Sequence, residues 1–128
     1  MLATSGLILY VHGARDPRWA APFVRLRDRI AALAPHCAVE IAYLEHVAPD
    51  LATAAAHMAA QGIARVRVVP MFFGRGGHLR DDFPAQLRAA RTAAPAVTFE
   101  VTQAAGESEQ VLDALAEFAL RATASVSP

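Results

Sequence analysis

The sequence alternates between short apolar runs and longer segments of mixed polarity, and this alternation restricts the fold more than any other feature. Four of the apolar runs are typical of β-strands, because they are short, rich in β-branched residues and either continuous or alternating. They lie at residues 6–11, 37–44, 65–73 and 97–101. Strands that alternate with helices along a chain form a parallel sheet with helices on both faces.

Between these runs, apolar residues recur at steps of three or four, the spacing of one helix face. The clearest series consists of Trp19, Phe23, Leu26, Ile30 and Leu33. Further helices are expected at residues 49–60, 83–93 and 107–122, the last with Val111, Leu115 and Phe118 as its apolar positions. The order of elements predicts an α/β fold, a three-layer α/β/α domain with a four-stranded parallel β-sheet.

The length of 128 residues fits a single domain. We assign residues 1–122 to this domain and predict that the small, polar stretch 123–128 forms a disordered tail. Hydrophobic residues make up 55% of the chain, which is too high a fraction for a disordered protein.

Charge and composition also restrict the partners. The net charge is zero, so the broad basic surface of a nucleic-acid-binding protein is not expected. No apolar run approaches the roughly 18 residues needed to cross a membrane, and the N-terminus lacks the features of a signal peptide. We therefore expect a cytoplasmic protein without a membrane partner. Cys37 is the single cysteine, so a metal bound by one chain would be held by nitrogen and oxygen ligands.

Three candidate metal ligands follow successive strands. In open parallel sheets, ligands bind beyond the carboxyl ends of the strands, where the sequence places His12, Glu45 and His78. They stand 33 residues apart in each step (45 − 12 and 78 − 45), about the length of one strand–helix unit. Two imidazoles and a carboxylate suit Co²⁺, Ni²⁺, Fe²⁺ or Zn²⁺, and three protein ligands leave coordination positions open for exchange.

Other interpretations of these residues remain open. A loop histidine is more often a polar surface residue than a ligand, and a carboxylate at a strand end is more often solvated or paired with arginine. His46 is an alternative to Glu45, but adjacent strand residues point to opposite faces, so only one of the two should face the site. We interpret His36 and His57 as surface residues.

Arginines and glycines surround the predicted histidines. Arg15, Arg75 and Arg80 lie on the same loops, and arginine binds carboxylates through two parallel hydrogen bonds. Gly76 and Gly77 would allow a flat ligand to approach the backbone, although their glycine-rich loop leaves a phosphate- or nucleotide-binding domain as an alternative. It lacks the established phosphate-binding patterns. Each arginine taken alone is equally consistent with a solvated loop residue, but together they indicate an anionic ligand with several carboxylates.

Three motifs resemble those of the small class II chelatases, the sirohydrochlorin cobalto- and ferrochelatases of the CbiX/SirB type. The resemblance covers roughly residues 5–120. The motifs are His12-Gly-Ala-Arg-Asp-Pro17, Tyr43-Leu-Glu45 and Val69-Pro-Met-Phe-Phe-Gly-Arg-Gly-Gly-His78-Leu-Arg-Asp-Asp-Phe-Pro84. In that family the two histidines bind the metal and take part in catalysis, and the strand-end glutamate falls on Glu45.

The resemblance implies a lyase that inserts Co²⁺ or Fe²⁺, with Ni²⁺ as a further option, into sirohydrochlorin in cobalamin or siroheme biosynthesis. The metal is then a substrate, no organic cofactor is needed, and the arginines and glycines above contact the tetrapyrrole. Larger members carry two such lobes, so the short form implies a homodimer. Ala14 stands where the family usually has serine, which removes a hydroxyl contact. A non-catalytic tetrapyrrole- or metal-binding protein is the alternative.

Overall fold

The computed structural model describes residues 4–74 and 76–125, with the side chains of residues 77–80 and 122–125 left out. Its sheet has four strands, all of them parallel, in the order β2-β1-β3-β4. The strands are β1 (Ser5–Val11), β2 (Cys37–Tyr43), β3 (Arg65–Pro70) and β4 (Thr98–Val101). The predicted α/β fold is therefore confirmed.

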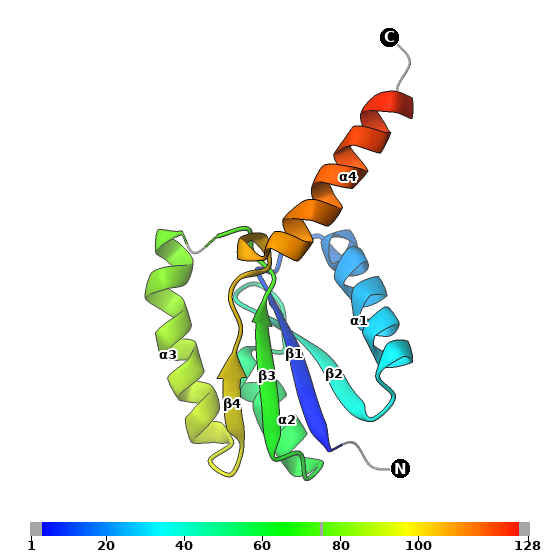
Figure 1. Ribbon diagram of the computed structural model, residues 1–128. Helices are drawn as coiled ribbons and strands as arrows, with labels where there is room; N and C mark the ends of the chain where they lie inside the picture. Colours follow the sequence, from blue (N-terminus) through cyan, green and yellow to red (C-terminus); the bar gives the residue numbers. More distant parts are fainter. Residues whose placement is uncertain (1–3, 75, 126–128) are drawn as a thin grey trace.

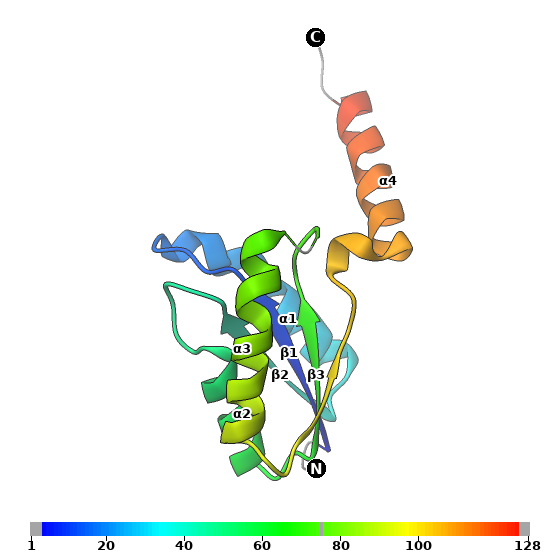
Figure 2. The same ribbon diagram turned by 90° about the vertical axis from the view of Figure 1, so that its left-hand side faces the viewer.

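Four α-helices and two short 3₁₀ helices connect and follow the strands. The α-helices are α1 (Ala21–Leu33), α2 (Leu51–Ala60), α3 (Gly77–Ala93) and α4 (Glu109–Ser125). The 3₁₀ helices are η1 (Pro17–Ala20) and η2 (Ala105–Glu107). Figures 1 and 2 show α1 on one face of the sheet and α2 and α3 on the other, which gives the three layers.

The two faces of the sheet pack against different helices because β-strand side chains alternate in direction. On one face, Leu9 and Ile41 pack against apolar residues of α1, among them Phe23 and Ile30. Leu33, the last residue of the predicted apolar series, is 86% exposed, so the part of this helix face that packs on the sheet ends before it. On the other face a larger core forms under α2 and α3, and its strand residues include Ile8, Tyr10, Ala42, Val66 and Val68.

Two helix boundaries differ from those predicted. Helix α3 begins at Gly77, six residues before the expected start, so Pro84 lies inside the helix and removes a backbone hydrogen bond that Arg80 would otherwise accept. Helix α4 continues to Ser125, so residues 123–125 of the predicted disordered tail are helical, and the rest of that tail lies outside the described residues. The third strand ends at Pro70, three residues earlier than predicted.

Helix α4 leaves the body of the domain instead of packing on the sheet (Figures 1 and 2). Its described residues are exposed, including the expected apolar positions Val111, Leu115 and Phe118. The two faces of the sheet are therefore covered by α1, α2 and α3, and α4 does not contribute to either layer. Among the described residues, no helix has the length and apolar character that a membrane-spanning segment needs.

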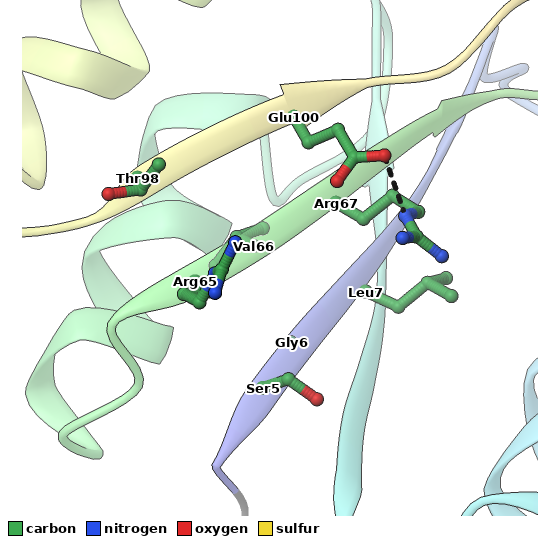
Figure 3. A pocket seen from close by; sticks show the side chains of 8 residues that line it. All are labelled: Ser5, Gly6, Leu7, Arg65, Val66, Arg67, Thr98 and Glu100. Atoms are coloured by element: carbon green, nitrogen blue, oxygen red, sulfur yellow. Dashed lines mark ion pairs between the residues drawn. The ribbon is translucent and has the colours of Figure 1, made fainter.

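Next to α1, part of the sheet is left uncovered over β3 and β4. A shallow hollow of about 340 Å³ lies there, lined by residues of β1, β3 and β4 (Figure 3). Arg67 and Glu100 form an ion pair across it, with Nε and Oε1 3.3 Å apart. The hollow is lined by both polar and apolar residues, and none of the predicted site residues lines it.

Candidate metal site

The sheet brings His12 and Glu45 together at the carboxyl ends of β1 and β2. Tyr43 pairs with Val11 as the last partners of the two strands, and the hydrogen-bond ladder continues one step further into the loops. Leu44 donates its backbone N–H to the carbonyl of Val11 (2.8 Å), and Glu45 donates to the carbonyl of His12 (3.0 Å). The backbones of the two predicted ligands are thus joined directly.

The side chains of this pair also approach each other. The His12 Nδ1 and Glu45 Oε1 atoms lie 3.8 Å apart, and the side chains are 47% and 36% exposed. This separation lets both contact one ligand, and their exposure leaves them open to solvent. The equal spacing in the sequence predicted equivalent positions for His12, Glu45 and His78, but the strand register does not follow 33-residue steps. Val11 pairs with Tyr43 and Tyr10 pairs with Pro70, so His12 and Glu45 approach each other although they are one residue out of register.

Gly13 allows this close approach. Its φ angle is +105°, and a Cβ atom added there would lie 2.0 Å from the backbone oxygen of Glu45. L-residues rarely adopt such a φ, and the contact would be a severe overlap. Gly13 therefore permits the path by which the chain leaves β1 alongside the Glu45 loop.

The alternative ligand, His46, is turned out of the strand path. Its φ angle is +68°, in the left-handed region, and its side chain is exposed. The next residue, Val47, donates its N–H to the Glu45 carbonyl (2.8 Å), which closes a tight turn. Glu45, rather than His46, therefore forms the described contact with His12.

The buried ring of Phe72 packs against His12. The rings of His12 and Phe72 meet edge to face with centroids 4.4 Å apart, and Phe72 is 6% exposed. Gly106 donates its N–H to the Phe72 carbonyl (2.8 Å), so the segment after β4 holds this residue in place. Phe72 was not predicted as a site residue, because the expected third strand ran through it.

Tyr10 lies beneath the same edge and is fully buried. Burial raises the pKa of its hydroxyl far above the ordinary value, and the nearby carboxylates of Asp82, Glu45 and Asp50 raise it further. The hydroxyl is therefore protonated at neutral pH and donates a hydrogen bond to Gln86 Oε1. Neither Tyr10 nor Gln86 was predicted as a site residue, because Tyr10 fits the buried face of a strand and Gln86 fits a polar position of a helix.

His78 and Arg80 lie on the first turn of α3, a helix that begins at Gly77 after Gly76 as its N-cap. The prediction that His78 sits in a loop is therefore wrong at the level of secondary structure. The helix starts at the end of the sheet where the strands terminate (Figure 1). The side chains of His78 and Arg80, and the whole of Arg75, lie outside the described residues.

The loop after His12 is organised by a local ion pair. Arg18 binds both carboxylate oxygens of Asp16, with contacts of 2.8–3.1 Å, and this arrangement lowers the pKa of Asp16. Asp16 also accepts a hydrogen bond from the backbone N–H of Arg18 at the start of η1. The side chain of Arg15 is exposed, as expected of a residue available to an anionic ligand.

Within the described part of the chain, no group of three or more His, Cys, Asp or Glu side chains is arranged to hold a metal ion. The described geometry covers two of the three predicted ligands, His12 and Glu45. His57 lies away from this edge and pairs with Glu40, with Nδ1 and Oε2 2.7 Å apart, and His36 is exposed.

The fold defines the chain as a single-lobe, three-layer α/β domain, and comparison with known proteins gives its family. The family model of CbiX matches residues 6–122, so the chain belongs to the CbiX family. The sirohydrochlorin cobaltochelatase of Sulfurisphaera tokodaii is 27% identical over 115 residues, 88% of each chain. The protein of that name from Saccharolobus solfataricus is 30% identical over 82 residues, 64% of this chain and 62% of the relative. That match thus spans less than two thirds of the relative.

Solved structures agree with this assignment. A putative cobalamin biosynthesis CbiX protein from Marinobacter aquaeolei superimposes with a TM-score of 0.83 at 27% identity, covering 95% of this chain and 99% of that one. The sirohydrochlorin chelatase SirB from Bacillus subtilis, solved in complex with cobalt, gives a TM-score of 0.76 at 21% identity, covering 89% and 49%. The resemblance predicted from the motifs is confirmed.

Proposed function

We propose that this chain is a sirohydrochlorin chelatase, a lyase that inserts a divalent metal into the tetrapyrrole ring. The observation that carries the proposal is the His12–Glu45 pair at the ligand-binding edge of a CbiX-family fold. Proteins named sirohydrochlorin cobaltochelatase are among its relatives, which favours Co²⁺ as the metal. Fe²⁺ and Ni²⁺ are the alternatives, because a set of imidazoles and a carboxylate accepts several of these ions.

In the proposed mechanism the metal is a substrate held by His12, Glu45 and His78. Insertion releases two pyrrole protons, which need a base close to the ring. A neutral imidazole can bind a metal ion and can also accept a proton, so a histidine that releases the ion can take up a proton in the same event. Glu45 acts as the third ligand or as a further proton acceptor. No organic cofactor is required.

The periphery of the tetrapyrrole carries carboxylates, which suit arginine side chains. We assign this contact to Arg15, Arg75 and Arg80, and we assign the space for the flat ring to Gly76 and Gly77. The exposure of Arg15 and Gly76 is compatible with this role. A nucleic acid or a membrane is not needed as a partner, and the expected location is the cytoplasm.

A homodimer is the proposed assembly. This chain corresponds to 49% of the length of SirB, so a second copy would supply a lobe of equal size. The exposed apolar residues of α4, which include Leu115 and Phe118, offer a surface that a second copy would cover. The dimer would place the two lobes on either side of the substrate.

The decisive test is metal insertion followed by absorption spectroscopy. The protein is mixed with sirohydrochlorin and Co²⁺ under anaerobic conditions, and the expected result is a spectral shift faster than in the protein-free reaction. His12→Ala should abolish the acceleration, whereas His57→Ala, which alters a histidine away from the site, should retain it. Binding of sirohydrochlorin without acceleration would refute the enzyme and favour a non-catalytic tetrapyrrole-binding protein. Parallel reactions with Fe²⁺ and Ni²⁺ identify the metal.

A further inference from the structure

One side chain connects the three chain segments that carry the proposed metal ligands. The amide of Gln86, on α3, accepts a hydrogen bond from the Tyr10 hydroxyl, with Oε1 2.5 Å from the phenol oxygen. Its Nε2 donates to the backbone carbonyl of Leu44 at 3.1 Å. The side chain is partly buried, so these hydrogen bonds are sheltered from water.

The partners of this amide are close in sequence to the proposed ligands. Tyr10 precedes His12 by two residues on β1, and Leu44 directly precedes Glu45. Gln86 itself lies eight residues after His78 on α3, a little more than two helical turns further along the same helix. The side chain of Gln86 therefore links α3 to the carboxyl ends of both β1 and β2.

Side-chain contacts join α3 to the sheet. The principal backbone neighbour of α3 is α2, so the helix reaches β1 through its side chains. The ring of Phe83 packs on that of Tyr10 with centroids 5.3 Å apart, and this contact holds the helix against the sheet without fixing its position along the sheet. The hydrogen bonds of Gln86 supply the directional part, because they depend on angle as well as distance.

The two hydrogen bonds of Gln86 require an amide side chain. It accepts from a phenol and donates to a carbonyl at the same time, which an ionised carboxylate cannot do. Methionine has a similar length and shape but makes neither hydrogen bond. A substitution of Gln86 by methionine therefore keeps the packing of the side chain and removes its hydrogen bonds.

We infer that Gln86 is a positioning residue, which sets the location of the His78 turn relative to the His12–Glu45 pair. Because this role needs these three residues to act together on a metal, it rests on the proposed function. Removal of groups that orient metal ligands commonly lowers metal affinity or activity by about 10–100-fold. A change of this size is expected when the Gln86 hydrogen bonds are lost.

The test compares Gln86→Met with Gln61→Met, a matched substitution at an exposed glutamine at the end of α2. Co²⁺ titrations followed by the visible absorption of the bound ion give the affinity and the coordination geometry. Gln86→Met should bind Co²⁺ about 10-fold or more weakly and with an altered spectrum, and should raise the KM for Co²⁺ more than the KM for sirohydrochlorin. Gln61→Met should match the wild type. A simple loss of stability would lower the active fraction without changing the spectrum of the bound ion.

Tyr10→Phe provides a second, milder variant, since it removes the hydroxyl and keeps the ring. It should change the Co²⁺ spectrum in the same direction, and its effect should not add to that of Gln86→Met, because both variants lack the hydrogen bond between Tyr10 and Gln86. If Gln86→Met does not fold, Tyr10→Phe decides by the same readouts. A folded variant with wild-type affinity and spectrum would overturn the positioning role alone. A wild-type chain that binds no Co²⁺ would instead refute the proposed function.

Discussion

Replacing Gly13 with alanine should destabilise the domain by about 2–6 kcal/mol, because two separate costs meet at this position. The first is conformational, since a φ angle of +105° costs a residue with a Cβ atom about 1–3 kcal/mol. The second is steric, since the new Cβ atom would lie 2.0 Å from the Glu45 oxygen. Relieving such an overlap in a packed region costs about 1–3 kcal/mol.

Alanine substitutions at two other glycines allow the conformational and steric costs to be measured separately. Gly62 has a φ angle of +82° with no atom within 4 Å of an added Cβ, and Gly74 has open space and no positive φ. Gly62→Ala should therefore carry the conformational cost alone, about 1–3 kcal/mol. Gly74→Ala should lie within about 0.5 kcal/mol of the wild type, as is usual for surface substitutions.

Urea unfolding followed by circular dichroism measures the free energy of unfolding of all three variants. The expected order of destabilisation is Gly13→Ala, then Gly62→Ala, then Gly74→Ala. Co²⁺ affinity should fall for Gly13→Ala alone, because relief of the overlap moves Glu45 away from His12. A Gly13→Ala protein as stable as the Gly74→Ala protein would refute the reasoning about this close approach.

Four further outcomes are expected. Asp50→Ala should lower the free energy of unfolding by about 1 kcal/mol, because the Asp50 carboxylate accepts a hydrogen bond from the Thr53 N–H at the start of α2. This hydrogen bond lowers the pKa of Asp50, so its contribution to stability is present at neutral pH. The difference between the variant and the wild type should disappear when unfolding is measured in acid, where the carboxylate is protonated. Phe72→Ala should cost about 3–5 kcal/mol in urea unfolding, and a smaller loss would contradict its tight packing against His12. The metallation rate should fall in acid, because a protonated imidazole cannot bind a metal ion, and a flat profile would argue against histidine ligation. Phe118→Glu should convert a dimer to a monomer in sedimentation experiments, and an unchanged mass would place the interface elsewhere.

Much of the sheet was predictable because its signals are local. Each strand has its own apolar pattern, and in a parallel sheet the carboxyl ends of all strands lie at the same edge. That is why the sequence anticipated the meeting of His12 and Glu45, although the register between the strands differs from 33-residue steps. The family motifs added the chelatase assignment, which the CbiX match supports at the level of the family.

Other features depended on contacts that no local pattern contains. The bond between Tyr10 and Gln86 joins residues 76 positions apart, and each residue taken alone fits an ordinary strand or helix position. Phe72 read as strand because it continues an apolar run, although the strand ends at Pro70. The start of α3 was misplaced because glycines and Pro84 usually mark a helix boundary rather than a helix interior.

The backbone hydrogen bonds that continue the β1–β2 ladder into the loops also fix a distance within the proposed site. Since His12 and Glu45 are joined through their backbones, the distance between them is set by strand register rather than by loop conformation. A slip of one residue would turn Glu45 to the opposite face of the sheet, and a slip of two would move it by about 6–7 Å. Natural or engineered changes in metal preference should therefore arise on the α3 side, where the spacing is set by side chains.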